Sequence, residues 1–72
     1  MSAEPAVLRM GRDITRQFAH LPPDRAAAEV AAHLGRFWEP RLRRELVALL
    51  ADATSEADPV LRAAAGLLGA AV

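Results

Sequence analysis

Apolar residues recur at three- and four-residue spacing along most of this 72-residue chain, in four segments separated by prolines. One apolar position every three or four residues forms a continuous stripe on an α-helix. The pattern predicts helices over about residues 5–19, 24–38, 40–53 and 59–69. No strand-like alternation or hairpin dipeptide is present, which argues against a β-sheet. The chain is therefore predicted to be all-α, a small bundle of three to four short helices.

Prolines and acidic residues mark where these helices begin and end. Leu21-Pro22-Pro23 ends the first helix, because a residue before proline is pushed out of the α region. Pro40 stops the second helix and suits the first turn of the third, and Asp58-Pro59 is an N-cap followed by proline at the first helical position. The predicted stripes consist of Val7, Gly11, Ile14, Phe18 and Leu21, then Ala27, Val30, Ala31, Leu34 and Trp38, then Leu42, Leu46, Leu49, Leu50 and Ala53, then Val60, Leu61, Ala64, Leu67 and Leu68.

The length of the chain limits it to one small core. Residues 1–72 are predicted to form a single helical domain, with residues 1–4 and the C-terminal tail disordered. Below about 80 residues, one core seldom supplies more than about 3–5 kcal/mol without disulfides, a metal or a partner. There is no Cys, which excludes disulfides and thiolate metal sites. A protein partner is thus the expected source of additional stability.

The balance of charges argues against several broad classes of function. The formal net charge is zero and every positive charge is Arg, whereas general nucleic-acid binders neutralise phosphates with an excess of basic residues. We therefore expect no nucleic acid as a partner. No signal peptide is apparent and no apolar run approaches about 18 residues, so we expect neither a membrane partner nor a membrane span.

The segment from His33 to Arg44 concentrates the residues that are typical of protein interfaces. It holds the only Trp, one of two Phe residues and four of the nine Arg residues, around a proline. Trp and Arg are enriched among interface hot spots. Trp38 has two interpretations at this stage, which are a partner contact and a packing anchor that locks the corner over Pro40. We predict that Trp38 and Arg41 lie at the surface that meets the partner.

The remaining candidate residues also have alternative roles. Glu39 and Arg43, and Arg41 and Glu45, are four residues apart and are expected to pair on the helix surface. The candidate partner-binding set is Arg9, Met10, His33, Phe37, Trp38, Pro40, Arg41, Arg43 and Arg44, with the face formed by Arg9, Arg12 and Arg16 as a second possibility. The alternatives are a solvated charged face for the arginines, a core filler for Met10 and a partly buried His33 with one hydrogen bond. No catalytic constellation accompanies these residues, so no enzyme activity, metal or cofactor is expected of this chain.

Two blocks of the sequence carry a family resemblance. The first is Leu8-Arg9-Met10 followed by Ile14 and Phe18, and the second is His33-Leu34 followed by Phe37-Trp38-Glu39-Pro40-Arg41-Leu42-Arg43. The order of His, an aromatic pair, an acid and then Pro-Arg-Met-Arg resembles the delta subunit of bacterial NAD-dependent, molybdenum-containing formate dehydrogenase. Leu42 replaces the usual Met, which is a nearly volume-conserving difference.

The resemblance implies a non-catalytic accessory subunit of a cytoplasmic formate dehydrogenase. Such a subunit binds the large catalytic (alpha) subunit, within a complex that contains the other subunits, and supports assembly, stability or cofactor insertion. The complex is implied to contain a molybdenum bis-pterin cofactor, iron–sulfur clusters, FMN and NAD, none of them bound by this chain.

Two functions of other classes remain open on the residues alone. The first is a small helical DNA-binding or antitoxin-like regulator, in which the second and third helices read the DNA. Zero net charge and a proline corner, in place of the usual Gly-containing turn, argue against it. The second is a free-standing structural helical oligomer.

Overall fold

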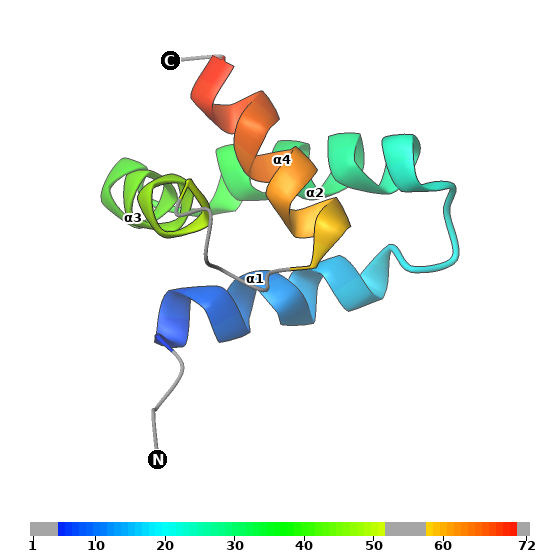
Figure 1. Ribbon diagram of the computed structural model, residues 1–72, viewed down its shortest axis with the longest axis horizontal. Helices are drawn as coiled ribbons and strands as arrows, with labels where there is room; N and C mark the ends of the chain where they lie inside the picture. The colour runs from blue at the N-terminus through cyan, green and yellow to red at the C-terminus, as the bar shows by residue number, and fades with distance from the viewer. Residues whose placement is uncertain (1–4, 52–57, 71–72) are drawn as a thin grey trace.

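A computed structural model describes residues 5–51 and 58–70 of the chain. Four helices follow one another in these residues, α1 (Ala6–Gln17), α2 (Pro23–Phe37), α3 (Pro40–Leu50) and α4 (Pro59–Ala70), and the described residues contain no strand (Figure 1). The predicted all-α bundle is confirmed.

The local sequence explains where three of the helices begin. Proline is the first residue of α2, α3 and α4, where its missing N–H is not needed and its fixed φ angle suits the helix. Asp58 caps α4, because its Oδ1 atom accepts hydrogen bonds from the backbone N–H groups of Val60 at 2.7 Å and Leu61 at 3.4 Å. The start signals read from Pro40 and from Asp58-Pro59 are confirmed.

Helix α4 is the central element of the bundle. It crosses α2 obliquely and packs most extensively on that helix, then on α3, and it also contacts α1 (Figure 1). Helices α1 and α2 run roughly side by side in opposite directions, and α3 lies across one end of the pair. The resulting molecule measures 33 × 25 × 21 Å along its principal axes.

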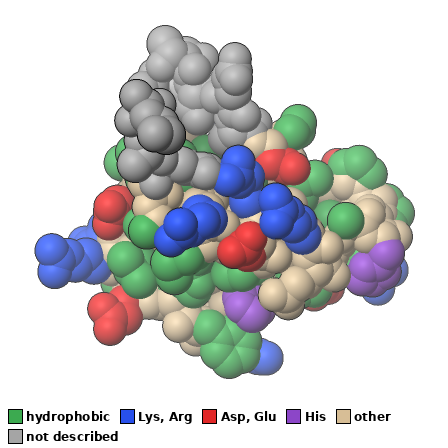
Figure 2. Space-filling model, turned by 90° about the horizontal axis from the view of Figure 1, so that it is seen from below, with side chains coloured by type: hydrophobic (Ala, Val, Ile, Leu, Met, Phe, Trp, Pro, Cys, Tyr) green, Lys and Arg blue, Asp and Glu red, His purple; other side chains and the backbone are tan. Residues whose placement is uncertain are grey.

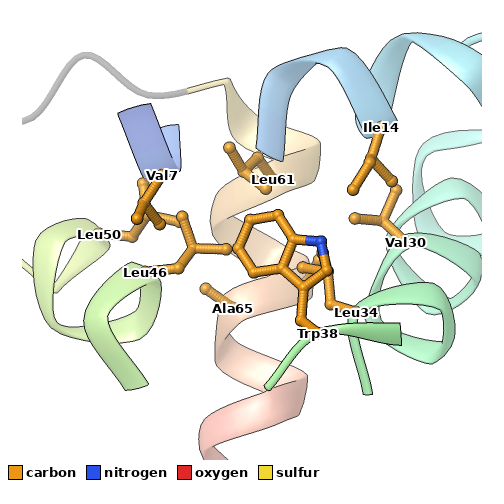
Figure 3. Close-up of a cluster of buried hydrophobic side chains, with 10 residues drawn as sticks. Val7, Ile14, Val30, Leu34, Trp38, Leu46, Leu50, Leu61 and Ala65 are labelled. Carbon is orange, nitrogen blue, oxygen red and sulfur yellow. The ribbon is translucent and has the colours of Figure 1, made fainter. Parts of the chain in front are cut away.

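The core lies where the four apolar stripes meet. Leu34, Leu46, Leu61 and Val30 are fully buried, and the indole of Trp38 lies among them (Figure 3). Leu34, Leu46 and Leu61 come from α2, α3 and α4 respectively, so the core consists of contacts between different helices. Burial of each such side chain contributes about 1.5–3 kcal/mol.

Gly11 allows α1 to approach α4 closely. A Cβ atom at this position would lie 3.1 Å from both terminal methyl groups of Leu61, which is itself fully buried. The small residue in the α1 stripe is therefore needed for the contact between α1 and α4. One turn later, the buried hydroxyl of Thr15 donates to the carbonyl oxygen of Gly11 at 2.9 Å, which satisfies a polar group inside the packed face.

The observed helix ends differ slightly from the predicted ones. Helices α1 and α2 end at Gln17 and Phe37 rather than at residues 19 and 38, and α4 continues to Ala70. The predicted end of α3 at residue 53, the predicted disorder of residues 1–4 and the part of the C-terminal tail after Ala70 lie outside the described residues. The prediction that Leu67 belongs to the apolar stripe of α4 is wrong, because 49% of its surface is exposed.

Candidate functional site

At the corner between α2 and α3, the side chain of Trp38 is part of the core. Trp38 has an extended backbone, with φ −92° and ψ 142°, so α2 ends before it. Its side chain lies on the core side, as its position four residues after the fully buried Leu34 predicts. Its side chain is 9% exposed and packs with Leu34, Leu46 and Ala65 (Figure 3). The expectation that Trp38 lies at the surface is therefore wrong for the bulk of its ring, which serves as the packing anchor of this corner.

Arg43 forms hydrogen bonds across the corner between α2 and α3. Its Nη1 atom donates to the carbonyl oxygens of Trp38 at 2.8 Å and Gly35 at 3.0 Å. These carbonyls belong to the last turn of α2, whose C=O groups lack partners within the helix, and a cation there also interacts favourably with the helix dipole. Arg43 is half-buried and is thus a structural clamp, a role that the sequence did not indicate.

The end of α3 is held in the same way. Arg62, from α4, donates from Nη1 to the carbonyl oxygen of Leu50 at 2.8 Å. Arg43 and Arg62 therefore each close the carboxyl end of the helix that precedes their own. The predicted surface pairs do not form in the described residues, where no ion pair joins Glu39 to Arg43 or Arg41 to Glu45.

Phe37 is the most exposed large apolar side chain described. It is 66% exposed at the end of α2, and its ring lies 4.8 Å from that of His33, one turn earlier, at a tilt of 47°. His33 is half-buried, so the two rings form an aromatic pair on the surface. An open hollow of about 340 Å³ lies beside the pair and is also lined by Phe18, Glu29 and Arg36.

A second hollow shares Phe37 with the first, and we call it the corner hollow. Met10, Phe37, Trp38 and Leu42 provide its apolar lining. Three charged side chains complete the lining, Glu39, Arg41 and Glu45, and the open volume is about 520 Å³. Met10 is 41% exposed, so part of this apolar lining is accessible to a partner. Four predicted partner residues thus line one hollow, namely Met10, Phe37, Trp38 and Arg41. A fifth, His33, lies beside it in contact with Phe37.

The remaining predicted residues lie elsewhere on the surface. Pro40 and Arg44 are exposed and line a smaller hollow of about 190 Å³ with Arg43, Val47 and Leu68, on α3 and the end of α4. Arg9 is exposed on α1. The structure therefore distributes the predicted set over separate hollows and the surface of α1 instead of assembling it into one site.

The second predicted face, on α1, is a mixed charged surface. Arg16 pairs with Asp13 at 3.4 Å, and both side chains are largely exposed, 75% and 61% respectively. Figure 2 shows basic side chains gathered near the middle of the face that carries α1, with acidic and hydrophobic side chains among them. Exposed pairs of this kind contribute between about 0 and 1 kcal/mol, so the pair indicates a solvated face.

The described residues contain no candidate metal site and no candidate membrane span. Among them, no group of three or more His, Asp or Glu side chains is placed to hold a metal ion. No helix in that part of the chain combines the length and the apolar character that crossing a bilayer requires.

Comparison with known proteins gives the family. A family described as NADH-dependent formate dehydrogenase delta subunit, FdsD, matches residues 6–65. The chain belongs to this family. The resemblance read from the two sequence blocks is confirmed, and the matched range contains α1, α2, α3 and the first half of α4, including the whole corner hollow of this formate dehydrogenase delta subunit. No curated protein and no solved structure matches the chain.

Proposed function

We propose that this chain is a non-catalytic accessory subunit that binds the large molybdenum-containing catalytic subunit of a cytoplasmic formate dehydrogenase. In this role it supports the assembly, stability or cofactor loading of the complex. The molybdenum bis-pterin cofactor, the iron–sulfur clusters, FMN and NAD belong to the other subunits.

The family match over residues 6–65 carries this proposal. Two features of the structure support it. Phe37 and Met10 are large apolar side chains that are 66% and 41% exposed, and they lie beside the same hollow. The core is also small, and proteins of this size gain stability from a partner.

The proposal is tested by removing the chain from cells that express the rest of the enzyme. We expect a lower yield of assembled complex, and an affinity-tagged copy of the chain should co-purify with the catalytic subunit. A complex that forms normally but lacks molybdenum indicates cofactor loading, whereas a low yield of fully loaded complex indicates assembly or stability. Normal yield, molybdenum content and formate-dependent NAD reduction without the chain, together with no co-purification, would contradict the proposal.

A further inference from the structure

We infer that the corner hollow is the docking site for an arginine side chain of the catalytic subunit. This inference rests on the proposed function and adds to it the surface and the chemistry of the contact. It follows from the shape of the hollow, from its apolar lining and from two carboxylates that have no partner within the described residues.

The apolar part of the hollow fits the stem of a long side chain. Met10 comes from α1, Phe37 from the end of α2 and Leu42 from α3, so the hollow lies where three helices meet. The accessible edge of Trp38 completes this lining, and the rest of its ring is fixed in the core. Because that core holds Trp38 in place, a contact with its edge requires little ordering of this chain on binding.

The charged part of the hollow favours a cation. Glu39 and Glu45 are exposed, and neither forms an ion pair or a side-chain hydrogen bond within the described residues. Arg41 is the basic residue that lines the hollow, and it too forms no such bond there. Two carboxylates against one guanidinium give the hollow a net negative charge.

This combination selects arginine over the other side chains. An acidic segment would face two carboxylates, and a purely apolar one would remove them from water without a partner, which is costly. Arginine supplies a planar fork that bonds carboxylates in pairs, stacks on exposed aromatic faces such as that of Phe37, and has an apolar stem. Lysine offers only a strongly hydrated point charge.

The test measures binding of the full-length chain to formate dehydrogenase purified without it, by biolayer interferometry. We expect Glu45→Gln and Glu39→Gln together to weaken binding by about tenfold or more, since truncating one side of a charge pair raises the dissociation rate. Arg41→Gln should leave affinity unchanged or raise it, because it makes the hollow more negative. The matched control is Asp24→Asn, which removes one exposed carboxylate at the opposite end of α2 and should leave affinity unchanged.

A second measurement reports on the hollow itself. Trp38 is the only Trp of the chain, so its indole N–H gives a single resonance in a ¹⁵N-labelled sample. This resonance should shift when the wild-type chain is titrated with N-acetyl-arginine amide at millimolar concentration, and less with the lysine analogue or with the double Gln variant.

The outcomes separate this inference from the proposed function. If the wild-type chain does not bind the enzyme at all, the proposed function fails and the inference fails with it. If the wild-type chain binds but the double Gln variant binds equally well, only the docking site is wrong. Weaker binding of Arg41→Gln would show that the contact is with an acidic segment, and that result would also overturn the inference.

Discussion

At the scale of single residues, two adjacent aromatic side chains have opposite environments. Phe37 is 66% exposed and Trp38 is 9% exposed. The difference follows the helical period, because Trp38 lies four residues after the fully buried Leu34, whereas Phe37 lies four residues after the half-buried His33. Identity alone does not separate the two residues, since both are large and apolar, and their positions relative to the apolar stripe of α2 decide which of them is part of the core.

The contrast gives a prediction about stability. Trp38→Ala should lower the free energy of unfolding by about 3–5 kcal/mol, because it leaves a cavity among Leu34, Leu46 and Ala65. Such a loss is comparable to the whole stability of a domain of this size. Phe37→Ala is the control and should change stability by less than about 0.5 kcal/mol, as exposed substitutions usually do. Urea titrations followed by far-UV circular dichroism measure both, and equal effects would show that the two rings share one environment.

Two glycines provide a second prediction. Gly66 lies inside α4 with open space where a Cβ atom would be, so Gly66→Ala should stabilise the chain by about 0.5–1 kcal/mol through higher helix propensity. Gly11→Ala gains the same propensity but places a methyl group 3.1 Å from the fully buried Leu61, and it should be destabilising. Thermal melts of the two variants should shift in opposite directions. A rise in melting temperature for Gly11→Ala would mean that Leu61 has room to move.

Sequence reasoning identified much of the core but not the direction of every side chain. Val30, Leu34, Leu46 and Leu61 follow the helical period and are buried as predicted. Ala65 was not in the predicted stripe and is buried, because α4 crosses over α2 and both sides of α4 meet other helices. Periodicity within one helix gives the apolar face, but the angle at which a neighbouring helix crosses it sets the width of the buried strip.

At the scale of elements, arginines secure the carboxyl ends of α2 and α3. Arg43 bonds the last carbonyls of α2, and Arg62 bonds that of Leu50. In both cases the donor belongs to the following helix, so one contact fixes both the end of a helix and the position of its neighbour. The α2–α3 corner therefore depends on a buried ring on one side and on a cation on the other.

A prediction follows for the α2–α3 corner. Arg43→Gln should lower the free energy of unfolding by about 1–2 kcal/mol, because the carbonyls of Gly35 and Trp38 lose a charged donor. Arg44→Gln is the matched control, since Arg44 is the adjacent and exposed arginine, and its effect should be within about 0.5 kcal/mol. Guanidinium chloride titrations measure the free energy of unfolding of both variants. Equal stability of the two variants would exclude a clamping role for Arg43.

The starts of the helices were predictable to within one residue, whereas contacts between elements were not. Pro40 and Asp58-Pro59 act within one turn of the chain, so the sequence is enough to place the starts of α3 and α4. Arg43 sits in a run of basic residues that looks like a solvated face, and its bond to Gly35 spans eight positions across a corner. Only the three-dimensional arrangement of α2 and α3 distinguishes Arg43 from Arg44. The same holds for the candidate site. The sequence indicated its residues, but it did not indicate that they line two separate hollows.

At the scale of the whole molecule, four short helices share one small core. All six pairs of helices are in contact, and the largest of these contacts joins α2 to α4. Because each helix contributes only a few buried side chains, none has a packed face without the others. The stability of the domain is therefore a property of the assembled bundle.

The isolated chain is predicted to be helical and only marginally stable. Its far-UV circular dichroism should be helical, and its thermal transition should be that of a marginally stable domain. A cooperative melt of the monomer above about 90 °C, the usual threshold for hyperstability, would contradict this expectation. Addition of the catalytic subunit should raise the midpoint, because a partner that binds only the folded state shifts the equilibrium by mass action.

We also predict that the purified, tag-free chain binds no metal, flavin or nucleotide. The chain has two His residues and no Cys from which to build a closed metal site. Elemental analysis and an absorbance scan check this, and one stoichiometric metal ion or chromophore would overturn the non-catalytic assignment.

The central position of α4 has a consequence for how the chain folds during synthesis. Translation produces α4 after α1, α2 and α3, yet α4 contributes Leu61, Ala64 and Ala65 to the core and packs on each of these three helices. A nascent chain that ends before residue 58 thus exposes the parts of the apolar faces of α2 and α3 that α4 covers in the bundle. Truncated copies that lack α4 should aggregate rather than fold, and the native bundle can form only after α4 has been synthesised.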